Sequence, residues 1–243
     1  MRTRGIAFAL LAAAVGAPAA GQERLSIDPS SRDRSQVFLG ADPSKVVAAE
    51  LAFARLAQDK GQWTAFSETS TDEAVMFVPA ATNARKYLKG RPNPAVAVKW
   101  QPHQVWMSCD GSLAVTKGAW QRPEGSGYFT TVWQRQKDGR YKWVMDQGDK
   151  LAQPLPEPEM IGGKVAECPK ASDDRRRRNP KPAMATISPP TCEGQQCRGG
   201  GAASDGTLVY AYSVAPSGAR RFTVQLRQDG ALREVLLSEV AAG

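Results

Sequence analysis

The stretch SLAVTKGAWQRPEGSGYFTTVWQRQKDGRYKWVMDQGD, residues 112–149, decides the fold of this chain. Its three runs of β-branched and aromatic residues are separated by turn sequences at 123–127 and 137–139. This pattern predicts three strands of an antiparallel meander. One more strand is expected just before them, over Ala95–Met107, with a bend at Pro102.

Helices are expected ahead of this meander. The dipeptide Asp42-Pro43 is typical of a helix N-cap and first turn, and apolar residues at helical spacing follow it as far as Gly61, which predicts the helix end. A second short helix is expected around Trp63, then a strand at Ala74–Val78 and a short helix over 83–89. Helices gathered on one side of an antiparallel sheet predict an α+β fold.

The chain after the meander divides into two segments. Residues 153–205 are rich in Pro, Gly and Arg and contain three of the four cysteines, so we expect a linker there. Residues 206–243 predict a three-stranded β-meander with turns at 216–218 and 229–230. Three strands of this length are marginal alone, so we expect them to pack on the first domain or on a partner.

Residues 1–20 predict a cleaved signal peptide. Arg2 and Arg4 precede a short apolar stretch that ends in small residues up to Ala20. The stretch is too short for an ordinary transmembrane helix, and no later segment is apolar enough to form a stable membrane span. We therefore expect a periplasmic or secreted protein, in a compartment that permits disulfides.

The positive charge of the chain does not predict nucleic-acid binding. The formal net charge is +8, and much of it comes from Arg175–Arg178 within the predicted linker. No nucleic-acid-binding motif accompanies this run, so we expect it to be solvated, and no nucleic acid as a partner.

The four cysteines, Cys109, Cys168, Cys192 and Cys197, are disulfide candidates. Four cysteines allow three complete pairings, and the sequence does not choose among them. If Cys192 and Cys197 close their short loop, Cys109 and Cys168 would tie the linker back to the first domain. Their spacing matches no zinc finger or ribbon, and the chain has one histidine, so we expect no metal site. No phosphate loop or dinucleotide fingerprint is present, and we expect no cofactor.

Seven short stretches carry a family resemblance: AELAFA (49–54), WTAF (63–66), AVMFVP (74–79), KGR (89–91), GAW (118–120), YFTTVW (128–133) and WVMD (143–146). With the order of the elements, they make residues 42–152 similar to the NTF2-like superfamily, and most similar to its SnoaL-like, DUF4440 type. The resemblance implies a cone-shaped barrel, in which a curved sheet wraps around a long helix and leaves a pocket. It also implies a homodimer through the open sheet face. The superfamily includes isomerases, cyclases and non-catalytic binding domains, so it implies no single function.

Aromatic side chains on the strands are the candidate ligand contacts. Trp106, Trp120, Trp133 and Tyr128 could line a pocket for an apolar or aromatic small molecule. Alternation along the strands shows which residues share a face but not which face points inward.

Three residues are candidates for acid–base chemistry. His103 is the only histidine and titrates near neutral pH, Asp146 would gain pKa in a dry pocket, and Tyr128 could act as an oxyanion donor. Each also has a simpler interpretation, as a hydrogen-bonded or exposed residue of the sheet. No motif fixes a catalytic role.

Three functions remain open. The set of acid–base groups is incomplete, so we expect a non-catalytic module of the bacterial envelope that binds or associates with a small molecule. The first alternative is a cofactor-free lyase, isomerase or hydrolase that uses a pocket acid–base pair. The second is an envelope interaction protein that acts through its basic linker and C-terminal strands.

Overall fold

The computed structural model describes residues 40–78, 80–169, 184–194 and 196–242. The predicted signal peptide and the run Arg175–Arg178 lie outside these residues. The described residues belong to one compact unit that begins at Leu39. None of its described helices is both long and apolar enough to cross a membrane.

Three helices precede the meander, namely α1 (Pro43–Lys60), α2 (Gln62–Thr69) and α3 (Ala84–Leu88). The predicted ends of α1 are confirmed. The Asp42 carboxylate accepts a hydrogen bond from the Ser44 amide at 3.1 Å, and Gly61 ends the helix with a φ of 98°. A Cβ at Gly61 would also lie 2.4 Å from Asn93, whose Oδ1 accepts a hydrogen bond from the Trp63 amide that opens α2. Glycine at this position therefore permits the tight junction between α1 and α2.

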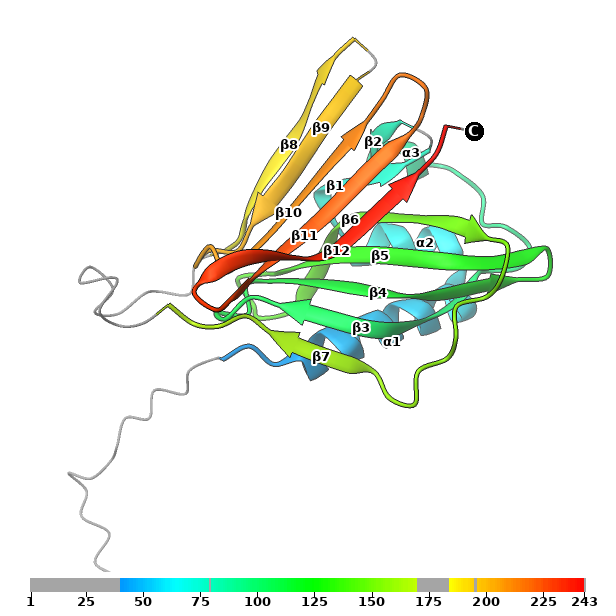
Figure 1. The fold of residues 1–243 in the computed structure, drawn as a ribbon. Helices are drawn as coiled ribbons and strands as arrows, with labels where there is room; N and C mark the ends of the chain where they lie inside the picture. Colours follow the sequence, from blue (N-terminus) through cyan, green and yellow to red (C-terminus); the bar gives the residue numbers. More distant parts are fainter. Residues whose placement is uncertain (1–39, 79, 170–183, 195, 243) are drawn as a thin grey trace, which may run out of the picture. The chain divides into compact units, whose positions relative to one another are not determined.

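The first sheet contains seven strands: β1 (Ser70–Phe77), β2 (Ala81–Asn83), β3 (Lys99–Met107), β4 (Leu113–Arg122), β5 (Gly125–Arg135), β6 (Tyr141–Leu151) and β7 (Gly162–Val165). Their order is β2-β1-β6-β5-β4-β3-β7 (Figure 1). The predicted meander is β3 to β6, and the expected bend at Pro102 is a register shift between Pro102 and Gln104.

The first sheet differs from the expected barrel in being open. Its edges are the short strands β2 and β7, which do not pair with each other. It is also mixed, since β1 runs parallel to β6 and β7 runs parallel to β3. Residues of α1 and α2 pack on one face of this sheet, where Phe53 and Ala65 belong to the same buried cluster as Trp133 and Trp143.

Glycines let the strands of this sheet approach closely around Phe129. Phe129 pairs with Gly118 on β4 and with Gly148 on β6. A Cβ at Gly118 would lie 2.0 Å from the carbonyl oxygen of Gln101, and one at Gly148 would lie 2.3 Å from that of Tyr128. Side chains are therefore excluded at both positions, which is how glycine allows a sheet to bend.

The second sheet is antiparallel and contains β8 (Thr186–Glu193), β9 (Gln196–Ala202), β10 (Leu208–Val214), β11 (Arg220–Gln228) and β12 (Ala231–Val240), in the order β12-β11-β10-β9-β8. It has two strands more than the meander expected at 206–243, and β8 and β9 come from the predicted linker. The glycines of β9 explain the difference. A Cβ at Gly199 would lie 2.3 Å from the hydroxyl of Tyr212, and one at Gly201 would lie 2.7 Å from the ring of Tyr210. Glycines that are typical of a flexible segment therefore lie in a strand here, because they leave space for the rings of Tyr210 and Tyr212.

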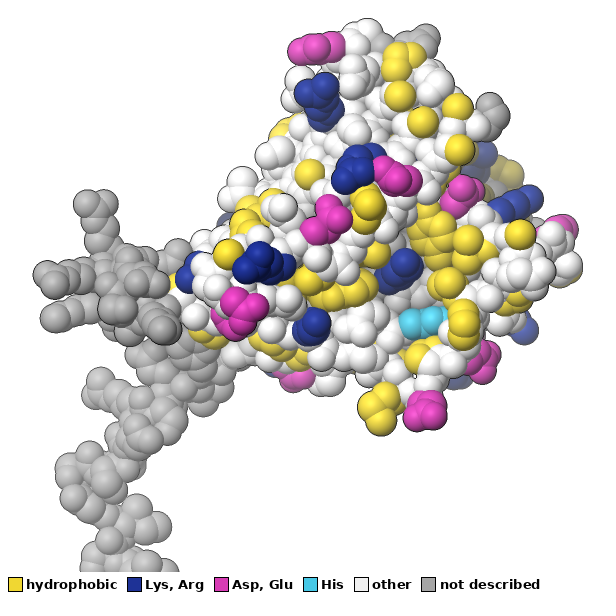
Figure 2. Space-filling model, viewed as in Figure 1, with side chains coloured by type: hydrophobic (Ala, Val, Ile, Leu, Met, Phe, Trp, Pro, Cys, Tyr) yellow, Lys and Arg dark blue, Asp and Glu magenta, His cyan; other side chains and the backbone are white. Residues whose placement is uncertain are grey.

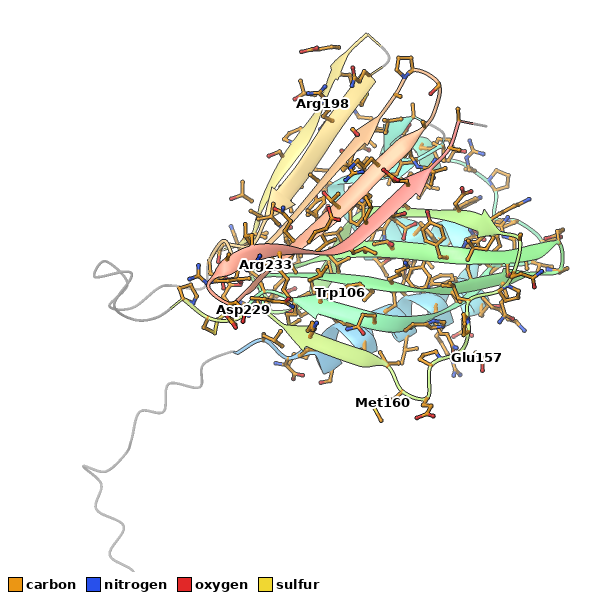
Figure 3. All side chains as sticks on the ribbon, in the orientation of Figure 1. Trp106, Glu157, Met160, Arg198, Asp229 and Arg233 are labelled. Atoms are coloured by element: carbon orange, nitrogen blue, oxygen red, sulfur yellow. A yellow bond between two sulfur atoms is a disulfide. The ribbon has the colours of Figure 1, made fainter. Side chains whose placement is uncertain are left out.

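The two sheets share one hydrophobic core. Val115 and Val132 of the first sheet belong to the same buried cluster as Leu208 and Phe222 of the second. Trp106 belongs to this cluster and is labelled in Figure 3. The second sheet therefore covers part of the face through which the resemblance implied a homodimer, and the homodimer stays a prediction.

Two disulfides and a polar junction hold the chain after β3. The structure pairs Cys109 with Cys168 and Cys192 with Cys197. The amide of Cys109 donates to the hydroxyl of Thr207 at 2.9 Å, which links the first sheet to the second.

Candidate functional site

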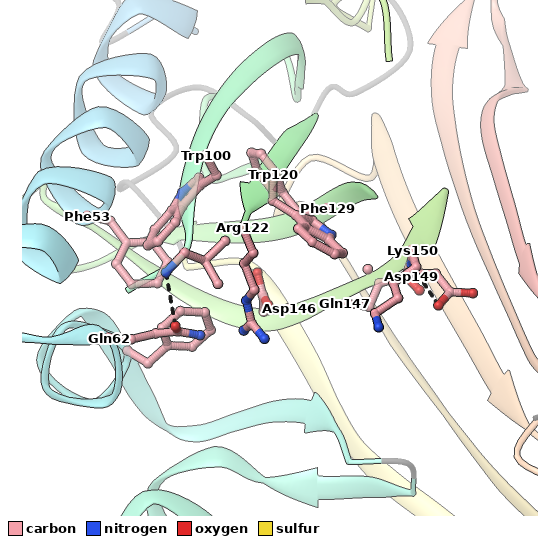
Figure 4. A pocket seen from close by; sticks show the side chains of 13 residues that line it. Phe53, Gln62, Trp100, Trp120, Arg122, Phe129, Asp146, Gln147, Asp149 and Lys150 are labelled. Carbon is pink, nitrogen blue, oxygen red and sulfur yellow. Dashed lines mark hydrogen bonds between the residues drawn. The ribbon is translucent and has the colours of Figure 1, made fainter. Parts of the chain in front are cut away.

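A cavity of about 310 Å³ lies between the helices and the concave face of the first sheet (Figure 4). Five aromatic side chains line it: Phe53, Phe66, Trp100, Trp120 and Phe129. Phe53 contacts both Phe66 and Trp100 edge to face, with 4.8 Å between ring centroids in each pair. The wall is thus preformed by packed rings, which is typical of a site for an apolar ligand.

The structure decides which face of each strand points into the cavity. On β5, Trp133 packs in the helix-facing cluster, whereas Val132 packs in the core between the two sheets. Phe129 shares the face of Trp133 by alternation and reaches the cavity. Trp120 on β4 also lines it.

Two carboxyl groups line the cavity, Asp146 and Asp149, and Asp146 is the one that a side-chain hydroxyl binds. It belongs to β6, is partly buried, and accepts a hydrogen bond from the Thr131 hydroxyl at 2.7 Å. Loss of solvent raises its pKa to about 8; the Thr131 hydrogen bond opposes this rise, and the nearby Glu50 adds to it. At pH 7 the carboxyl group is therefore mainly protonated and can donate a hydrogen bond.

A further carboxyl group, Glu50, lies fully buried behind the wall. Its Oε1 accepts from Trp100 Nε1 at 2.8 Å, and its Oε2 accepts from the Thr116 hydroxyl at 2.6 Å and from Trp133 Nε1 at 2.9 Å. Burial raises the pKa of Glu50, and the three hydrogen bonds oppose the rise. These bonds fix the indole of Trp100, so Glu50 orients part of the cavity wall.

Sequence reasoning did not select Glu50, although a signal was present. The buried positions of α1 are Val46, Glu50, Phe53 and Ala57. A carboxylate within an apolar helical stripe needs a polar partner in the core, since a buried charge without hydrogen bonds is costly. The stripe could have indicated a buried carboxylate, but not the tryptophans that bind it.

The structure brings two of the predicted site residues to the cavity, Trp120 and Asp146. Trp133 is buried behind the cavity wall, where its indole donates to Glu50. Trp106 is in the core between the sheets. Tyr128 forms a 2.8 Å hydrogen bond with Ser238 of the second sheet, so it also lies outside the cavity lining.

His103 does not line the cavity. It sits at the register shift of β3, is partly exposed, and Figure 2 shows histidine colour at the surface. Partial burial lowers its pKa, while Glu157 opposes the change. Its Nε2 is buried without a hydrogen-bond partner among the described residues. The proposed acid–base pair of His103 and Asp146 is therefore not assembled at this cavity.

No group of three or more His, Cys, Asp or Glu side chains within the described ranges is arranged to hold a metal ion.

Comparison with known proteins gives likenesses of fold. No protein-family model matches the chain, and no curated protein matches it. Among solved structures, a candidate ketosteroid isomerase from Parabacteroides distasonis is 18% identical, covers 42% of this chain and 85% of its own, and has a TM-score of 0.35. A candidate aromatic ring hydroxylase from Novosphingobium aromaticivorans is 12% identical, with coverages of 47% and 92% and a TM-score of 0.36. An NTF2-like protein of unknown function from Burkholderia xenovorans is 14% identical, with coverages of 48% and 90% and a TM-score of 0.32.

The fold is α+β, with helices packed on one face of a curved mixed sheet. Helices on the concave face of a curved sheet, with a cavity between the layers, are what the sequence resemblance implied. What the similar structures bind or catalyse is a property of those proteins.

Proposed function

We propose that this protein binds a flat, mainly apolar small molecule in the cavity beside Asp146. The observation that carries the proposal is a wall of five aromatic rings beside the Asp146 carboxyl group, which accepts a hydrogen bond from Thr131. Rings bind a flat apolar ligand through burial and stacking, and a small number of polar groups orient it.

Asp146 supplies the polar contact in this proposal. One of its oxygens accepts from Thr131, and its other oxygen has no hydrogen-bond partner among the described residues. A protonated carboxyl group in an apolar wall favours a ligand with a carbonyl or hydroxyl oxygen at this position, because its proton would otherwise lack an acceptor.

Export to the periplasm or the medium is part of the proposal. The two disulfides support it, since such bonds persist in oxidising compartments. The signal peptide and the DUF4440 type remain predictions from the sequence.

The test is calorimetric titration of the protein, from residue 21, with the neutral probe 2-naphthylacetamide. Trp120→Ala should weaken binding at least tenfold, because the indole forms part of the wall. Trp63→Ala is the matched control, because Trp63 packs on Phe66 but does not line the cavity. No measurable binding of this probe, or equal loss in both variants, would count against the proposal.

A second candidate function is acid–base catalysis. The observation that favours it is again the pKa of Asp146, which is about 8 and therefore suits proton transfer near neutral pH. The expected signature is an activity that Asp146→Asn abolishes while the affinity for the same compound is retained. An activity that survives this substitution would exclude Asp146 as the proton carrier.

Interaction with an envelope partner remains a prediction. Its basic segment lies outside the described residues, and β8 and β12 are the edge strands of the second sheet. Loss of a partner on neutralising Arg175–Arg178 would support it, and unchanged association would argue against it.

A further inference from the structure

A second hollow adjoins the cavity and extends it. This outer groove, of about 430 Å³, is bounded on one side by the segment Pro94–Val96 and on the other by the turn at Pro123–Gly125. Three residues line both hollows: Trp120, Arg122 and Lys150. A ligand that is longer than the inner cavity would therefore pass these three side chains.

Basic side chains at this junction lack a carboxylate partner. Neither Arg122 nor Lys150 forms an ion pair within the described part of the chain, where such pairs occur elsewhere on the surface. The nearby Asp149 turns one oxygen to the amide of Lys150 at 2.8 Å, and Glu124 lies in the outer groove. These two acids reduce the local positive charge but leave both basic groups free to bind a ligand.

Arg122 is the better placed of the two basic residues. It extends from β4 into the cavity in Figure 4, and its guanidinium lies 5.9 Å from the centre of the Trp120 ring. Stacking on an aromatic face restrains a long side chain, and a planar guanidinium can bind both oxygens of a carboxylate. Lys150 adds a second positive charge beside it.

We propose that the ligand is an aromatic carboxylate, with its ring system in the inner cavity and its carboxylate on Arg122 at the junction. The inference rests on the proposed function and adds the charge of the ligand and the residue that selects it.

The interior of the cavity is compatible with an anion at its mouth. Asp146 is mainly protonated at neutral pH, so it does not repel the carboxylate. Glu50 does not line the wall, and its two oxygens accept hydrogen bonds from Trp100, Thr116 and Trp133.

The experiment compares 2-naphthylacetate with 2-naphthylacetamide, which has the same rings and no charge. Both are titrated into the protein from residue 21 at pH 6.5 and low salt, by calorimetry. We expect the anion to bind about tenfold more tightly than the amide, because its contact with Arg122 is charge-assisted. Arg122→Gln should reduce this ratio to within twofold.

Arg91→Gln is the matched control. Arg91 also stacks on an aromatic ring, Tyr87, with its guanidinium 4.0 Å from the ring centre, but it lines neither hollow. The Arg91→Gln variant should therefore keep the tenfold preference for the anion over the amide.

The outcomes separate the two proposals. If the amide binds and the anion binds no better, or if the preference persists in Arg122→Gln, the charge selection is overturned and small-molecule binding stands. If neither probe binds, both are overturned.

Discussion

Replacing Asp146 by Asn should make the protein more stable, and increasingly so as the pH rises. The carboxyl group has a pKa of about 8 in the folded protein, against an ordinary value of 3.8. At a pH between these two pKa values, Asp146 is protonated in the folded state and ionised in the unfolded state. The free energy of unfolding therefore falls by about 1.4 kcal/mol for each unit by which the pH rises. The stability is fully present below the ordinary pKa and is lost as the pH rises through that range to the folded pKa.

The slope of stability against pH sets the size of the stability difference between wild type and Asp146→Asn. At pH 7 the wild-type protein should have lost roughly 4 kcal/mol through this one group. The figure is an upper limit, because Asp146 keeps partial contact with solvent in the cavity. Asn has the same shape, can accept the Thr131 hydrogen bond and never ionises.

The assay is urea unfolding of both proteins at pH 5, 6, 7 and 8, with the difference in free energy plotted against pH. Asp138→Asn is the control. Asp138 is exposed, and its hydrogen bond with Arg140 lowers its pKa, so the difference between Asp138→Asn and wild type should be constant across this range. A flat difference for Asp146→Asn would refute the raised pKa, and with it the neutral carboxyl group in the proposed site.

Three further predictions concern stability and can be measured by urea unfolding. Glu50→Ala should cost roughly 3 kcal/mol, because Trp100 loses its acceptor and the Thr116 hydroxyl and Trp133 Nε1 keep only longer hydrogen bonds, of 3.3 and 3.2 Å; a cost below about 1 kcal/mol would show that the bonds to Glu50 do not stabilise the core. Gly118→Ala should cost about 2–3 kcal/mol, because its Cβ would lie 2.0 Å from a backbone oxygen, and unchanged stability would mean that the strands can separate there. Breaking the disulfide of Cys109, which spans 59 residues, should cost about 4 kcal/mol, against about 2 kcal/mol for that of Cys192, which spans 5. Equal costs would contradict the expectation that a disulfide stabilises a protein more when it closes a longer loop of the unfolded chain.

Local features of the fold were predictable because they depend on neighbours in the chain. The Asp42 cap, the end of α1 at Gly61 and the strands of the meander follow from hydrogen bonds, backbone freedom and side-chain alternation within a few residues. Trp120 is the one of the four aromatic candidates from the strands that lines the cavity, because alternation groups residues by face but does not say which face points inward.

The sequence by itself determined the order of the helices and of the four meander strands, the α+β class and a short set of aromatic and acidic candidates, whereas β2, β7, β8 and β9 were not predicted. Only the tertiary structure decided which face of each strand points inward, and so placed Asp146 in the cavity and Tyr128 outside it. It also placed a glycine-rich segment in β9, where Gly199 faces Tyr212 of the neighbouring strand β10. The physical reason is the same in each case: burial, desolvation and close packing are set by residues far apart in the chain, and alternation along one strand carries no information about what lies opposite it.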